Sequence, residues 1–160
     1  MKNLFRFILF ILIIINIPKI SFAISPDVFI QSTVNRASQI LSKEISREEK
    51  INELKIIAEE TVDIEGVGFY SLGSIRKTLN KKQLENYSVL FKKYFLKSFS
   101  SRLAEYTNPQ IEVQNKKILS ENLYIVNSVL VGTIDRPEVK IDWRVYTKDS
   151  EYPLIRDLII

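Results

Sequence analysis

The hydrophobic periodicity of this 160-residue chain changes once, at Asn108-Pro109, and this change constrains the fold more than any other feature. Before it, apolar residues recur every three or four positions, which predicts amphipathic helices. After it, a period of two appears, which predicts strands. Helices followed by strands favour an α+β domain, in which N-terminal helices pack on a curled antiparallel sheet, a meander of about four strands.

Three helices are predicted from their starting signals and the apolar stripes that follow. Ser25-Pro26-Asp27 combines a capping hydroxyl, a proline at the first helical position and an acid in the first turn. Ser46 and Glu49 have the spacing of a capping box, and residues 80–83 have the layout of another N-terminal cap. The third helix has the broadest stripe, formed by Leu84, Tyr87, Leu90, Phe91, Tyr94, Phe95, Leu96, Phe99, Leu103 and Tyr106. We expect a stripe of this width to bury more than one face of the helix.

Strands are predicted at residues 111–113, 123–131, 139–146 and 154–160. In 139–146 every second residue is apolar, and such residues share one face of a strand. We expect this inward face to include Ile141, Trp143 and Val145, together with Val129 from the preceding strand. Asp142 and Arg144 then share the other face, where a cross-strand ion pair or hydrogen bond is their expected role.

Residues 1–23 have the pattern of a cleaved secretory signal peptide. Lys2 and Arg6 precede an apolar run at 7–15, and Ser21-Phe22-Ala23 supplies small residues at the two positions that a signal peptidase recognises. The run is too short to cross a hydrocarbon core of ~30 Å as a helix. We therefore expect an exported protein with a single domain at residues 24–160.

Composition removes several classes of function. Without residues 1–23 the chain has 20 Lys and Arg against 19 Asp and Glu, so its charge does not predict a nucleic-acid partner. The absence of Cys excludes disulfides and thiolate metal sites, and the absence of His excludes a Ser-His-Asp triad and His-ligated metals. We predict no catalytic residue, no metal site and no cofactor, and hence no enzyme.

Short motifs distributed over almost all of residues 24–160 resemble, in their order and spacing, the MlaC or toluene-tolerance family of periplasmic phospholipid-binding proteins. The motifs are Asp63-Ile64, Leu72-Gly73, Gln83, Phe91, Phe95-Leu96, Phe99, Leu103, Tyr106, Asp142-Trp143-Arg144 and Asp157-Leu158-Ile159. Arg76 differs, because the family usually has Trp there. The family also continues beyond the last predicted strand, so we expect this chain to be truncated at its C-terminus relative to the family.

The resemblance implies a periplasmic carrier with a bound phospholipid as its cargo. It further implies that the carrier moves lipid between the outer membrane and an inner-membrane ABC transporter, so that its partners are this transporter and an outer-membrane lipoprotein/porin complex, and that it maintains outer-membrane lipid asymmetry. The candidate lipid-binding residues are Phe69, Leu72, Tyr87, Phe91, Phe95, Phe99, Val129, Ile141, Trp143 and Val145.

Two alternatives stay open at this point. The first is an exported protein-interaction module of the same fold, with a filled core and no ligand, because aromatic residues at helical spacing usually form core. The large aromatic residues argue against it, because residues 24–160 contain five of the nine Phe, all seven Tyr and the one Trp, more than a two-layer core of this size obviously needs. The second is an enzyme that uses Asp or Glu for acid-base chemistry, and it is weaker because no pair of acids lies within an apolar segment.

Overall fold

Helices and strands are segregated along the chain, and the predicted α+β class is confirmed. The computed structural model describes residues 23–134 and 136–160. All of the predicted signal peptide except Ala23 lies outside the described residues, so that peptide stays a prediction. The helices are α2 (Pro26–Ser42), α3 (Arg47–Thr61), α4 (Ile64–Ser71), the 3-10 helix η1 (Gly73–Lys77) and α5 (Lys81–Leu103). The strands are β1 (Ile111–Ser120), β2 (Leu123–Leu130), β3 (Val139–Tyr146) and β4 (Leu154–Ile159).

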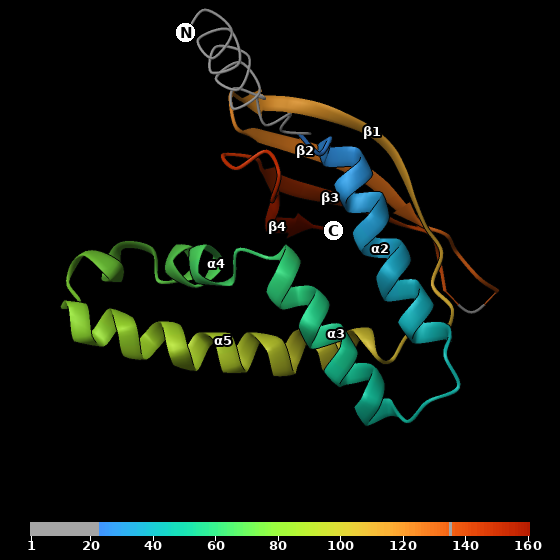
Figure 1. Ribbon diagram of the computed structural model, residues 1–160, viewed down its shortest axis with the longest axis horizontal. Helices are drawn as coiled ribbons and strands as arrows, with labels where there is room; N and C mark the ends of the chain where they lie inside the picture. The colour runs from blue at the N-terminus through green and yellow to red at the C-terminus, as the bar shows by residue number, and fades with distance from the viewer. Residues whose placement is uncertain (1–22, 135) are drawn as a thin grey trace, which may run out of the picture.

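The four strands form one open antiparallel sheet in the order β1-β2-β3-β4. This order confirms the predicted meander. Val126 pairs with Trp143 and Ser128 pairs with Ile141, so these four side chains share one face of the sheet. Helix α2 lies across this face, as Figure 1 shows.

A closed hydrophobic core fills the space between α2 and this face of the sheet. It consists of Ile30, Val34, Val126, Ile141, Trp143, Val145 and Ile155. The indole Nε1 of Trp143 donates a hydrogen bond of 2.8 Å to Ser128 Oγ, so the only tryptophan is buried without an unpaired donor. A second buried cluster joins α2 to α3 through Ile40, Leu41, Leu54 and Ile57, and Leu103 packs against it. This contact anchors the C-terminal end of α5.

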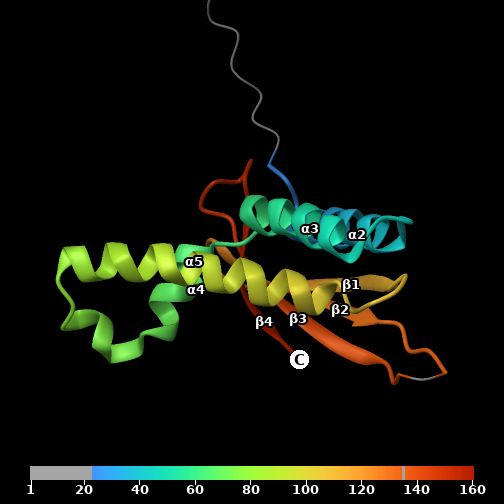
Figure 2. The same ribbon diagram turned by 90° about the horizontal axis from the view of Figure 1, so that it is seen from below.

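The N-terminal half of α5 projects beyond the sheet and packs on α4 (Figures 1 and 2). The expectation that α5 buries more than one face is wrong, because Leu90 is 65% exposed and Tyr94 is 70% exposed. Only Ser100 is fully buried among the described residues of this helix. The helices α3 and α4 cover one side of α5 and leave these two apolar side chains in solvent.

Two of the three helix starts form as predicted, and the third differs in one contact. Capping boxes are present at Ser46 with Glu49 and at Asn80 with Gln83. The hydroxyl of Ser25 does not cap α2 and instead donates to the carboxylate of Asp27. Helix α4 was not predicted from the sequence, and the side chain of its N-cap residue Asp63 accepts a hydrogen bond of 2.9 Å from Gly66 N.

Candidate functional site

A row of four aromatic rings lies along one side of α5. Tyr87, Phe91, Phe95 and Phe99 are spaced four residues apart, so they fall on one stripe of the helix. Consecutive ring centroids are 5.6, 6.1 and 5.3 Å apart and the rings are stacked. All four side chains are only half-buried. The row is thus ordered without being enclosed, unlike the side chains of the core under α2.

Helix α4 is held close against the start of this row. A Cβ atom at Gly68 would lie 2.7 Å from Cδ1 of Phe91, so a glycine permits the close approach of the two helices. The hydroxyl of Tyr87 donates to the carbonyl of Gly68 at 3.1 Å and lies 2.8 Å from Ser71 Oγ. Leu72, a further candidate residue, is the half-buried C-cap of α4. These contacts fix α4 beside the aromatic row.

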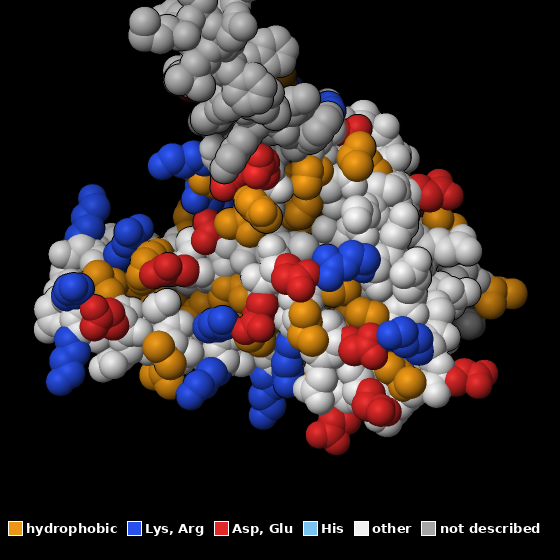
Figure 3. All heavy atoms as spheres, viewed as in Figure 1, with side chains coloured by type: hydrophobic (Ala, Val, Ile, Leu, Met, Phe, Trp, Pro, Cys, Tyr) orange, Lys and Arg blue, Asp and Glu red, His pale blue; other side chains and the backbone are white. Residues whose placement is uncertain are grey.

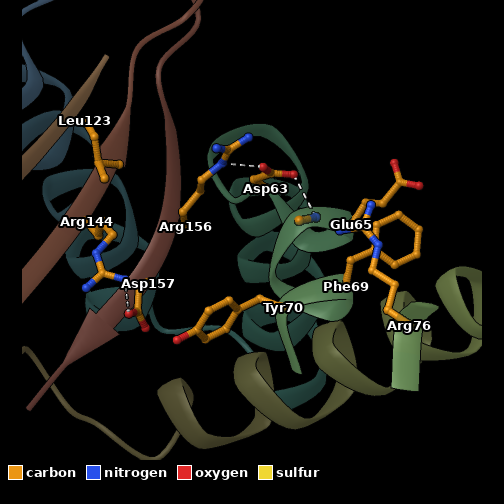
Figure 4. Close-up of a pocket in the computed structure, with 10 residues that line it drawn as sticks. Asp63, Glu65, Phe69, Tyr70, Arg76, Leu123, Arg144, Arg156 and Asp157 are labelled. Carbon is orange, nitrogen blue, oxygen red and sulfur yellow. Dashed lines mark hydrogen bonds and ion pairs between the residues drawn. The ribbon is translucent and has the colours of Figure 1, made fainter. Parts of the chain in front are cut away.

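An open cleft of about 570 Å³ lies between α4 and one end of the sheet, and Figure 4 shows its lining. The lining residues are Asp63, Glu65, Gly66, Phe69, Tyr70, Arg76, Leu123, Arg144, Arg156 and Asp157. In Figure 4 the ring of Tyr70 extends from α4 toward β4, whereas Arg76 and Phe69 lie together on the far side. Phe69 is the only predicted site residue among these ten.

The charges that line the cleft are balanced and largely paired. Arg156 Nε lies 2.7 Å from Asp63 Oδ2, and Arg144 Nη1 lies 3.0 Å from Asp157 Oδ2 across the β3–β4 pair. Arg76 carries no acidic partner among the described residues and lies over the ring of Phe69, 4.6 Å from its centroid. The cleft therefore combines apolar rings with fixed ion pairs and one guanidinium without an acidic partner.

The predicted polar roles of Asp142 and Arg144 are confirmed. Arg144 forms the cross-strand ion pair with Asp157, and Asp142 accepts a hydrogen bond of 2.6 Å from Asn127 Nδ2. The Arg144 Nε atom is buried and has no hydrogen-bond partner among the described residues. Among the described cleft residues, it is the only buried side-chain donor without a hydrogen-bond partner.

The candidate lipid-binding residues on the strands lie in a different part of the structure from those on the helices. Ile141, Trp143 and Val145 belong to the closed core beneath α2 and do not line the cleft. Val129 pairs with Lys140, so it lies on the face opposite Ile141 and Trp143, and the predicted common inward face is wrong for this residue. The reason is that residues 123–131 are apolar with little alternation, so the sequence does not fix which side chains face α2.

Most of the residues that line the cleft were not predicted as site residues from the sequence. Asp63, Arg144 and Asp157 were recognised only as parts of motifs, and Tyr70, Leu123 and Arg156 were not singled out. A useful signal was Asp63 itself, since aspartate is a favoured N-cap residue whose side chain accepts a hydrogen bond from the backbone three residues on, here Gly66 N. No sequence pattern indicated that this cap would also bind an arginine on β4.

The described residues contain no group of three or more acidic or metal-binding side chains that could hold a metal ion. Within the same residues, no helix has the length and apolar character needed to cross a membrane.

Four helices followed by an open, four-stranded antiparallel sheet form a class of α+β fold that solved structures share. One such structure is a phospholipid-binding protein from Ralstonia solanacearum, determined in complex with a phospholipid. It matches with a TM-score of 0.69 and 12% sequence identity, covering 86% of this chain and 78% of the other chain. A sequence search of curated proteins found no match. The family model described as MlaC protein matches residues 31–160, and the chain belongs to this family.

Proposed function

We propose that this protein binds a phospholipid without chemical conversion and carries it through the periplasm. In this proposal its partners are an outer-membrane lipoprotein/porin complex and an inner-membrane ABC transporter. The observation that carries the proposal is the family match over residues 31–160. The related fold that was solved with a phospholipid supports the class of ligand.

The side of α5 that carries the aromatic row is the best candidate for contact with the acyl chains. Its rings are only half-buried, and Phe69 lines the open cleft, so both offer apolar surface to a ligand. Two acyl chains contain about 30 methylenes, whose transfer from water contributes over ~20 kcal/mol. The free energy of transferring the lipid from water to the carrier must be close to that of transferring it to a membrane. A much more favourable site would trap the lipid, and a much less favourable one would never receive it.

We accordingly centre the proposed site on Phe69, Leu72, Tyr87, Phe91, Phe95 and Phe99. Ile141, Trp143 and Val145 are packed beneath α2, and a lipid would reach them only if α2 moved away. That closed core is the observation that favours the alternative, an interaction module without a ligand. The absence of catalysis is also part of the proposal, and two of the three carboxylates that line the cleft, Asp63 and Asp157, are paired with arginines.

Native mass spectrometry of the gently purified, exported protein tests the proposal. We expect a mass increment of one phospholipid per chain, released as intact lipid by denaturing extraction. A protein without bound lipid, prepared beside a longer family member that retains its own, would favour the interaction module. N-terminal sequencing of the same sample tests export, since processing after Ala23 gives a chain that begins at Ile24.

A further inference from the structure

The charges of this chain are unevenly distributed. Helices η1 and α5, residues 73–103, are called the basic arm here and contain eight Lys and Arg residues and one acid, Glu85. The remaining residues, 24–72 and 104–160, contain 12 Lys and Arg against 18 Asp and Glu. A nearly neutral sequence is thus divided into a cationic arm and an acidic remainder.

The positive charges of the arm are exposed and few of them are paired. All eight basic side chains are exposed. In the described part of the chain, only Lys81 and Lys92 have acidic partners, Glu85 at 3.8 Å and Glu59 at 2.9 Å. Figure 3 shows Lys and Arg side chains gathered where Figure 1 places η1 and α5. Six unpaired cations on one projecting element create a strongly positive surface.

Exposed apolar side chains lie among these cations. By helical spacing, Lys82, Val89, Lys93 and Lys97 fall on the side of α5 away from the aromatic row, and Leu90 lies beside them. Val89 and Leu90 are exposed, as are Tyr94 on α5 and Ile75 on η1. Membrane binding by a helix increases with the apolar area that it buries and with its attraction to anionic lipids, and the arm offers both exposed apolar side chains and exposed cations.

We propose that the basic arm is a docking surface for an anionic lipid membrane. Its lysines and arginines would meet lipid phosphates, while Leu90 and Tyr94 enter the boundary between headgroups and acyl chains. The basic residues surround more than one side of α5, which suits a diffuse anionic surface better than the fixed carboxylates of an acidic protein. The N-terminal half of α5 also extends beyond the sheet in both views, so the sheet does not obstruct this part of the arm (Figures 1 and 2).

Cosedimentation with vesicles tests this inference on the exported protein. We expect binding to phosphatidylcholine vesicles that contain phosphatidylglycerol, little binding to phosphatidylcholine alone, and weaker binding as salt is raised. The variant K82E/K93E/K97E should bind the anionic vesicles more weakly by a factor on the order of a hundred, since each lysine near such a surface contributes roughly fivefold. High salt screens the attraction between charges and leaves the apolar contribution to binding. The variant L90S/Y94S should therefore be released from the vesicles more easily than the unaltered protein at high salt.

The matched control is K117E/K140E/K148E, which changes the net charge equally. These three lysines are exposed, lie outside the arm and form no ion pair with any described residue. We expect the control to retain binding to within about threefold of the unaltered protein. The unaltered protein and all variants are compared with the same N-terminus, either with residues 1–23 or without them. Differences in binding among them therefore report on the substituted positions.

Three results would overturn the inference. They are failure of the unaltered protein to bind anionic vesicles at low salt, equal loss in the two triple variants, and binding through the arm to an acidic protein but not to vesicles. Circular dichroism of each variant separates loss of binding from loss of structure. Lipid cargo is measured independently, because a chain that docks but contains no phospholipid in native mass spectra contradicts the proposed function and leaves this inference intact.

Discussion

Replacing Gly68 with alanine tests the contact that holds α4 against the aromatic row. The new Cβ would lie 2.7 Å from Cδ1 and 3.1 Å from Cγ of Phe91, and both ring atoms are close to the helix backbone and cannot swing away cheaply. Overpacking of this kind costs about 1–3 kcal/mol, whereas alanine gains roughly 0.5–1 kcal/mol over glycine inside a helix. We expect Gly68→Ala to destabilise the protein by about 1 kcal/mol.

The Phe91→Ala background supplies the control. Without the ring the clash is absent, so Gly68→Ala should now stabilise by roughly 0.5–1 kcal/mol. The two effects of the same substitution then differ by about 2 kcal/mol, well above the ~0.3–0.5 kcal/mol within which independent sites add. Urea unfolding, followed by the fluorescence of the buried Trp143, measures all four free energies of unfolding. Equal stabilisation in both backgrounds would refute the packing of α4 on Phe91.

Three further predictions concern the aromatic row, a surface ion pair and the cleft. Phe95→Trp should lower lipid occupancy without lowering the thermal midpoint of the delipidated protein. If Phe95 were instead part of a close-packed core, the same substitution would destabilise the protein by ~1–3 kcal/mol. Hydrogen bonds from Lys116 and Ser25 lower the pKa of Asp27 from 3.8 to about 2, so its stabilising effect is present above pH 3.8 and lost as the pH falls through about 2. Because Asp27 is partly exposed, Asp27→Asn should cost less than ~1 kcal/mol in urea unfolding at pH 5 and nothing at the lowest pH. Arg156→Gln leaves Asp63 without its cation and should destabilise by about 1 kcal/mol, measured by the urea midpoint, and no change would show that the pair is only a surface contact.

The sequence predicted those features that are set by local patterns. The capping boxes at Ser46 and Asn80 depend only on residues three positions apart, and both are present. The change of period after Pro109 correctly separated helices from strands. Strand β1 was predicted at 111–113 but extends to Ser120, because most of its side chains are exposed and a polar edge strand has no apolar alternation to reveal it.

Features that depend on neighbouring elements were not predictable in this way. Helix α4 has eight residues and two glycines, too short and too weak in helix formers for a recognisable stripe. The exposure of Leu90 and Tyr94 is determined by how far α3 and α4 cover α5, and the helix sequence does not contain that information. The cleft likewise arises from residues far apart in the chain, such as Asp63 and Arg156.

The open shape and polar lining of the cleft lower the free-energy cost of maintaining such a space. A sealed, empty apolar cavity of 570 Å³ would cost about 14 kcal/mol at ~24 cal/mol per Å³, as much as the entire stability of a small domain. The observed cleft is open, and Arg144, Arg156 and Asp157 interact well with water, so hydration avoids most of that cost. In the proposed site, the apolar surface for a lipid is then mainly the aromatic row of α5, whose rings are half-buried. We therefore expect stability to depend mainly on the closed core beneath α2 and lipid binding on the half-buried rings of the row, which is why Phe95→Trp is expected to separate binding from stability.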